Sequence, residues 1–160
     1  MPAMSILSLE DLKPLLTSYR RLLGLDLGTK TIGLALSDLS RTVATPHSTI
    51  ARTKFTADVT ELLKIVDKEE VFALVLGLPI SMDGTEGPRC QSTRQFAANL
   101  MKLRDIPIIY WDERLSTAAV TRTLLEADAS RKRRSEVVDK MAAAYILQGA
   151  LDALSRSALF

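Results

Sequence analysis

The sequence predicts an α/β domain in which helices cover both faces of a mixed, five-stranded sheet. Two apolar segments, residues 22–27 and 31–37, flank a Gly-Thr-Lys turn and predict an antiparallel hairpin, which a third strand within residues 42–50 extends. Short apolar runs at residues 72–78 and 106–111 alternate with helical patterns, as parallel strands do when helices cover both of their faces. We therefore expect three antiparallel meander strands followed by two parallel ones.

Helices are expected on both sides of the later strands. Apolar residues recur at helical spacing over residues 55–66 and again over residues 96–103. Two closing helices are expected, one from Ser116 to about Ala127 and one from Ser135 through Asp152. Residues 128–134, between these two helices, are expected to form a flexible loop.

Length and composition limit the organisation of the chain. With 160 residues, 47% hydrophobic and 25% charged, the chain fits one globular domain, which we place at residues 21–155 after an extension (1–20) and before a tail (156–160). The lone Cys90 cannot form an intramolecular disulfide, so a cytoplasmic location is the default. The sequence contains no run of about 18 consecutive apolar residues, so no membrane partner is expected. A single histidine, His47, argues against multi-histidine zinc sites.

Asp26 interrupts an otherwise apolar strand. A buried carboxylate without compensation is costly or becomes protonated, so a cationic group is expected to face it. Two structural alternatives are that the carboxylate caps the following turn, or that it forms an ion pair with Lys30.

A second acidic site, Asp112-Glu113-Arg114, follows the last apolar strand directly. In parallel sheets, ligand-binding groups gather at the carboxyl ends of the strands. Alternation along a strand places Asp112 and Glu113 on opposite faces, so only one of them can easily join Asp26. The alternative is ordinary charge in a loop between a strand and a helix.

Asp139 is expected in the first part of the last helix. It lies in line with a stripe of small and apolar residues: Ala142, Ala143, Ile146 and Ala150. This stripe predicts close packing of the helix on the sheet, with Asp139 at its end. The alternative is an acid favoured there by the helix dipole alone, which is worth about 0.5 kcal/mol.

Together, the three acids predict an oxygen-rich cluster at one edge of the sheet. Such a cluster suits Mg²⁺ or Mn²⁺ rather than zinc. Two such ions, about 4 Å apart, would activate water and stabilise the leaving oxygen in phosphodiester hydrolysis.

Local basic clusters support a nucleic-acid partner better than the net charge of +2 does. A basic run precedes the Asp139 helix: Arg131, Lys132, Arg133 and Arg134. Next to the acids, Lys30 and Arg114 are expected to neutralise a phosphate. The alternatives are a solvated basic loop and structural ion pairs.

The Gly- and Pro-rich segment at residues 77–88 is expected to face the substrate, with Ser81, Asp83 and Thr85 offering polar contacts. No interleaved aromatic platform is seen, and the preferred interpretation of Tyr110 and Trp111 is burial in the core.

Four blocks of sequence, in order, resemble a known family. They are LDLGTKTIGLA at residues 25–35, VLGLP at residues 75–79 with Gly84, DERLST at residues 112–117, and DKMAA at residues 139–143 with Ile146 and Leu147. Over residues 22–151 the chain is similar to the YqgF family of pre-16S rRNA nucleases, also described as Holliday-junction resolvase-like proteins, within the RNase H-like superfamily.

The resemblance implies an RNase H-like fold and a divalent-metal-dependent nuclease whose catalytic and metal-binding acids are Asp26, Glu113 and Asp139. Asp112 stays an alternative to Glu113. The favoured role is 5′-end maturation of 16S precursor rRNA, and Holliday-junction resolution on branched DNA is the alternative. A resolvase that cuts two strands symmetrically is expected to be a homodimer, whereas a monomer suffices to trim one RNA end.

Two other classes of protein fit the sequence less well. An ATP-binding protein of the actin, heat-shock chaperone and sugar-kinase type also carries an Asp-Leu-Gly-Thr phosphate loop, but such proteins pair two halves and this chain is too short for the second. A non-catalytic RNA- or ribosome-binding factor would leave the acids at residues 26 and 139 without a purpose.

Overall fold

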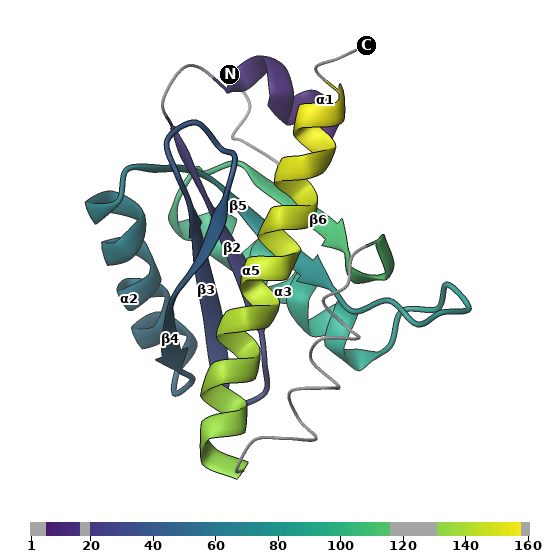
Figure 1. The fold of residues 1–160 in the computed structure, drawn as a ribbon. Helices are drawn as coiled ribbons and strands as arrows, with labels where there is room; N and C mark the ends of the chain where they lie inside the picture. Colours follow the sequence, from purple (N-terminus) through teal and green to yellow (C-terminus); the bar gives the residue numbers. More distant parts are fainter. Residues whose placement is uncertain (1–5, 17–19, 116–130, 158–160) are drawn as a thin grey trace.

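The computed structural model describes residues 6–16, 20–115 and 131–157, with the backbone only for residues 131–139 and 156–157. The strands are β1 (Ile6–Leu7), β2 (Arg21–Leu27), β3 (Thr31–Ser37), β4 (Ala44–Ala51), β5 (Val71–Leu78) and β6 (Ile108–Asp112). The helices are α1 (Leu9–Leu12), α2 (Phe55–Lys68), α3 (Pro88–Leu103) and α5 (Arg131–Ser157), with 3-10 turns η1 (Lys13–Leu15) and η2 (Glu113–Leu115). Helix α5 lies across one face of the sheet, and α2 and α3 lie on the other (Figure 1).

The strands form one mixed sheet in the order β1-β6-β5-β2-β3-β4. As predicted, β2, β3 and β4 form an antiparallel meander, and β5 and β6 continue the sheet in parallel with β2. The expected count of five strands is wrong, because Ile6 and Leu7 pair in parallel with Ile108 and Ile109 and add a sixth strand, β1. Two residues are too few to show the alternation by which a strand is recognised in a sequence.

The last helix is longer than predicted. It begins at Arg131 rather than at Ser135 and ends at Ser157 rather than at Asp152. Residues 131–134 are therefore helical and not a flexible loop, in keeping with the good helix propensity of Arg and Lys. The helix expected from Ser116 to Ala127 lies outside the described residues.

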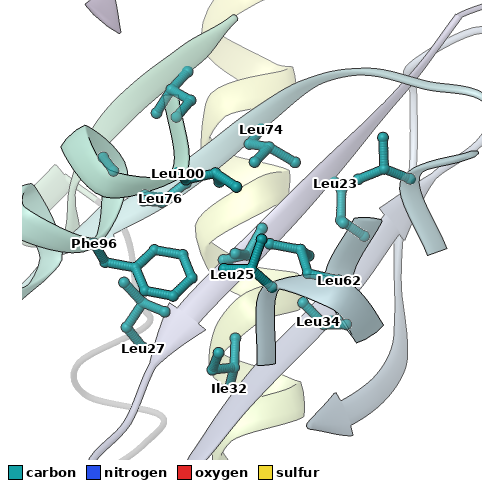
Figure 2. Close-up of a cluster of buried hydrophobic side chains, with 14 of the residues drawn as sticks. Leu23, Leu25, Leu27, Ile32, Leu34, Leu62, Leu74, Leu76, Phe96 and Leu100 are labelled. Carbon is teal, nitrogen blue, oxygen red and sulfur yellow. The ribbon is translucent and has the colours of Figure 1, made fainter. Parts of the chain in front are cut away.

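The side of the sheet under α2 and α3 carries a dense aliphatic core (Figure 2). Every second residue of β2 faces this side, because side chains alternate along a strand. The labelled members of the cluster are Leu23, Leu25, Leu27, Ile32, Leu34, Leu62, Leu74, Leu76, Phe96 and Leu100. This core holds β2 and β5 rigidly side by side.

On the opposite side, α5 approaches the sheet very closely. A Cβ atom at Gly24 of β2 would lie 2.7 Å from the Cβ of Leu147 and 2.9 Å from the main-chain oxygen of Ala143, so only glycine fits there. The predicted packing stripe is confirmed, since its members are buried: Ala142, Ala143, Ile146 and Ala150. Within the described parts of the chain, no helix combines the length and apolar character needed to cross a bilayer.

The segment before β2 packs against the C-terminal half of α5 (Figure 1). Ser8 caps α1 by accepting a hydrogen bond from the main-chain N–H of Asp11 (3.1 Å). Leu12 at the end of α1 is fully buried, whereas Leu15 in η1 is 39% exposed.

Leu12→Ala is therefore expected to lower the free energy of unfolding by about 3 kcal/mol, through lost burial and the cavity left behind. Leu15→Ala removes the same atoms from a partly exposed site and is the matched control, with an expected loss of about 1 kcal/mol or less. Urea denaturation measures both values. A loss for Leu12→Ala as small as that for Leu15→Ala would contradict this prediction.

Candidate functional site

Asp26 lies in β2, opposite Gly33 of β3, with its side chain 1% exposed. Because it is two residues after Gly24, it shares the face of the sheet on which α5 packs. The main-chain N–H of Gly28 donates to the main-chain oxygens of Asp26 (3.1 Å) and Thr31 (2.9 Å), so backbone hydrogen bonds close the turn that follows. The strand therefore holds a buried carboxylate at its carboxyl end.

Glu113 is the first residue of η2, directly after β6, and its side chain is 3% exposed. A Cβ atom built at Gly77 of β5 would lie 2.9 Å from Glu113 Oε2 and in contact with Ile146 of α5. Gly77 pairs with Trp111 of β6, and the pairing of Leu25 with Leu76 puts the next residue, Asp26, level with Gly77. Glu113 and Asp26 thus lie on the same face of the sheet, on either side of a residue without a side chain.

Asp112, the alternative to Glu113, is engaged elsewhere. Its carboxylate accepts hydrogen bonds from Arg114 Nη2 (2.7 Å), Nε (3.0 and 3.1 Å) and the main-chain N–H (3.0 Å). These hydrogen bonds lower the pKa of Asp112 and hold the carboxylate at the partly exposed side of the turn. The structure therefore places Glu113, and not Asp112, on the side of Asp26.

Asp139 lies in α5, one helical turn before Ala143, the residue whose carbonyl oxygen approaches Gly24. The N-terminal part of α5 lies by the carboxyl end of β2 (Figure 1), so the backbone of Asp139 is at the same end of the sheet as Asp26. Its side chain is outside the part of the chain that the structure describes. Among the side chains that are described, no three acids, histidines or cysteines form a group able to hold a metal ion.

Of the cations predicted to bind substrate, the structure describes the side chains of Lys30 and Arg114 but only the backbone of the basic run. Lys30 is exposed in the turn directly after β2. Arg114 is held by Asp112 in η2, and its Nη1 lies 3.8 Å from a Cβ built at Gly84, in the β5–α3 loop. The basic run Arg131, Lys132, Arg133 and Arg134 forms the first turn of α5, with only its backbone described.

Two further cations, which the sequence analysis missed, contact the turn after Asp26. Arg52 Nη1 donates to the main-chain oxygen of Gly28 (2.7 Å), and Arg89 Nη2 donates to that of Leu27 (3.2 Å). A signal for Arg52 was present in the sequence. In a three-stranded antiparallel meander the first and third strands run in the same direction, so their carboxyl ends are at the same end of the sheet. The residue after β4 therefore lies near the residue after β2.

The β5–α3 loop projects from the body of the protein (Figure 1) and is closed by its own hydrogen bonds. Asp83 Oδ1 accepts from the main-chain N–H (3.0 Å) and the hydroxyl (2.7 Å) of Thr85, so these polar side chains bind each other. At the base of the loop, the Arg94 guanidinium binds Glu86 at 2.7 and 2.8 Å. That loop side chains contact substrate stays a prediction.

The two aromatic residues of β6 have different surroundings. Trp111 is 5% exposed in the core under α5, which confirms its predicted burial. Tyr110 is partly buried under the guanidinium of Arg94, 4.9 Å from the ring centre, and its burial raises the pKa of the phenol.

Comparison with known proteins gives the family. The model of the family described as RuvX, Holliday junction resolvase, matches residues 20–153. A protein of Paramagnetospirillum magneticum is 72% identical over 149 residues, which cover 93% of this chain and 96% of that protein. A protein of Rhodospirillum rubrum is 62% identical over 154 residues, or 96% of each chain. Both relatives bear the name "Putative pre-16S rRNA nuclease".

Solved structures give the fold. RuvC of T. thermophilus, in complex with a Holliday junction substrate, matches with a TM-score of 0.53 at 13% identity, over 86% of this chain and 97% of that one. The yeast mitochondrial Holliday junction resolvase Ydc2 matches with a TM-score of 0.52 at 12% identity, over 95% of this chain and 86% of that one. These likenesses confirm the predicted RNase H-like fold. The family match and the two close relatives confirm the resemblance stated above: the chain belongs to the RuvX (YqgF) family of nucleases and Holliday junction resolvases.

Proposed function

We propose that this chain hydrolyses phosphodiester bonds with divalent cations, Mg²⁺ or Mn²⁺, held by Asp26, Glu113 and Asp139. The observation that carries the proposal is the placement of the first two carboxylates. Both are almost fully buried, and both lie on the α5 side of the sheet beside Gly77. Bringing two buried carboxylates together is unfavourable unless a cation compensates their charge.

The chemistry of the donors fits a hard divalent cation. The proposed site offers only carboxylate oxygens, the ligands that Mg²⁺ and Mn²⁺ prefer. Asp139 completes the set in this proposal, because it belongs to the N-terminal part of α5, which lies by the carboxyl end of β2, where Asp26 is (Figure 1). When bound, two cations would activate the attacking water and stabilise the leaving oxygen.

The residues of the chain supply position and charge. Strand β2 holds Asp26 and the turn η2, directly after β6, holds Glu113 against the packed core, so neither carboxylate has to be ordered when substrate binds. Lys30, Arg114 and the basic run at Arg131, Lys132 and Arg133 are proposed to hold the phosphates of the substrate. A monomer suffices if the substrate is one RNA end, whereas a homodimer is expected if two strands of a DNA junction are cut symmetrically.

The favoured substrate is the 5′ end of 16S precursor rRNA, supported by the names of the relatives at 72% and 62% identity. The second candidate is a Holliday junction in DNA, supported by the description of the family model. Depleting the protein and mapping 16S rRNA 5′ ends separates the two. Accumulated unprocessed 5′ ends support the first, and normal maturation favours the second.

In vitro, Asp26→Asn and Asp139→Asn are each expected to abolish cleavage of a transcript that carries the 16S precursor 5′ end, because each removes a proposed metal ligand. Cleavage by the unaltered protein is expected to stop with EDTA and to return with excess Mg²⁺ or Mn²⁺. Glu61→Gln, on the exposed surface of α2, is the control for loss of one acid and is expected to cut normally. Full activity of both Asn variants would disprove the metal site.

A further inference from the structure

Two guanidinium groups converge on the turn that joins β2 to β3. Arg52 comes directly after β4 and donates from Nη1 to Gly28 O (2.7 Å), while its main-chain N–H donates to Lys30 O (2.8 Å). Arg89, in the first turn of α3, donates from Nη2 to Leu27 O (3.2 Å), the carbonyl next to Gly28 O. The two arginines thus bind the carbonyl oxygens of the two residues that follow Asp26.

Like Arg21 and Arg41, which also donate to main-chain oxygens, these two arginines lack, in the described part of the chain, the carboxylate partner that three other arginines have. Arg94, Arg104 and Arg114 each bind a carboxylate, those of Glu86, Asp67 and Asp112 respectively. Within the described residues, Arg52 and Arg89 take part in no such ion pair, and their partners are neutral carbonyl oxygens. A guanidinium has five N–H donors, so one hydrogen bond to a carbonyl leaves most of its capacity for an anion.

The position of the two arginines relative to the acids is also informative. Asp26 and Glu113 face α5, whereas α3, which carries Arg89, lies on the opposite side of the sheet. Arg52 lies directly after β4, which is two strands away from β2 in the sheet. The carboxyl ends of β5, β2 and β4 are at the same end of the sheet, so a nucleic-acid strand that crosses this end can reach both the acids and the arginines.

We propose that Arg52 and Arg89 bind backbone phosphates of the nucleic-acid strand that is cleaved at the acids. This inference rests on the proposed function, since it assigns part of the substrate path to that site. The contacts to Leu27 O and Gly28 O aim each guanidinium and fix the turn in one conformation. Such contacts position the strand without reading its sequence.

The test is the salt dependence of binding, measured in EDTA so that no cleavage occurs. The probe is a labelled single-stranded RNA, with a four-way DNA junction run in parallel. Arg52→Gln and Arg89→Gln remove the charge but keep a side-chain N–H that can donate to the turn. Each is expected to reduce the slope of log K against log salt by about 0.7 on single-stranded RNA, and to weaken binding roughly four-fold at 0.15 M salt.

Lys102→Gln is the matched control, because it removes one exposed cation from the other end of the same helix that carries Arg89. It is expected to leave both the slope and the affinity unchanged. Arg52→Lys and Arg89→Lys keep the charge and are expected to restore most of the slope.

A purely structural role predicts a different result. If the arginines only hold the turn, the Gln variants will lower the melting temperature or kcat while the salt slope stays that of the unaltered protein, and the inference is overturned. Unchanged slopes with unchanged stability overturn it as well. Cleavage that survives in the Asp26 and Asp139 variants would instead reject the proposed function, independently of the slopes.

Discussion

Replacing Glu113 by Gln is expected to lower kcat for phosphodiester cleavage about a thousand-fold, equivalent to about 4 kcal/mol of transition-state stabilisation. The amide keeps the shape of the side chain in its buried position but removes the charge that is proposed to bind the cation. Asp112→Asn, one residue away, is the matched control. It is expected to change kcat about five-fold at most, because it weakens only the partly exposed ion pair with Arg114.

Single-turnover kinetics on the same substrate measure both effects, and thermal melting checks that the variants stay folded. Mn²⁺ titration adds a second readout, since Glu113→Gln is expected to shift the half-saturating Mn²⁺ concentration upward and Asp112→Asn is not. The reverse result, with Asp112→Asn inactive and Glu113→Gln active, would indicate that Asp112 and not Glu113 binds the metal, and it would reject the proposed site.

Gly77→Ala is the second large effect. The new Cβ would meet Ile146 of α5 and lie 2.9 Å from Glu113 Oε2, so both side chains must move. Overpacking of this kind is expected to cost about 2 kcal/mol, which corresponds to a melting temperature lower by roughly 4–8 °C for a chain of this size. Cleavage is expected to fall further than this loss of stability explains, because the displaced group is a proposed metal ligand.

A double variant separates packing from chemistry. Ile146→Val removes the Cδ1 atom that the new methyl group would meet, so Gly77→Ala with Ile146→Val is expected to regain melting temperature without regaining cleavage. Gly87→Ala is the control, since a Cβ there has no neighbour within 4 Å. If the double variant recovers both properties together, the tight contact at Gly77 concerns packing alone.

Much of the fold could be predicted because its signals are local. The hairpin of β2 and β3, the parallel strands β5 and β6 and the helix α2 each leave a periodic pattern within a few residues. β1 could not be found in this way, because two residues form a strand only through the edge of β6 that they join. The start of α5 was missed because a run of four basic residues is as compatible with a loop as with a helix.

The candidate site shows the same division. Sequence alone indicated that Asp26 is buried, because the strand around it, Leu22 to Leu27, is otherwise apolar, as in strands that are covered on both faces. It also determined that only one of Asp112 and Glu113, at the carboxyl end of β6, can join Asp26, because alternate residues face opposite sides. Which acid joins is decided by tertiary structure: Arg114 folds back onto Asp112, and η2 turns Glu113 toward Gly77.

Arg52 and Arg89 mark the limit of what the sequence by itself determines. For Arg52, the meander predicted from the sequence brings the residue after β4 near the residue after β2, but it does not say which group the guanidinium contacts. For Arg89, the local pattern says only that a helix has begun. Their common target, the backbone after Asp26, exists only once β4 and α3 have packed beside β2. The sequence by itself determined the family, the strand that carries Asp26 and the class of chemistry. Tertiary structure alone decided which charged groups meet there, because those contacts join residues that are far apart in the chain.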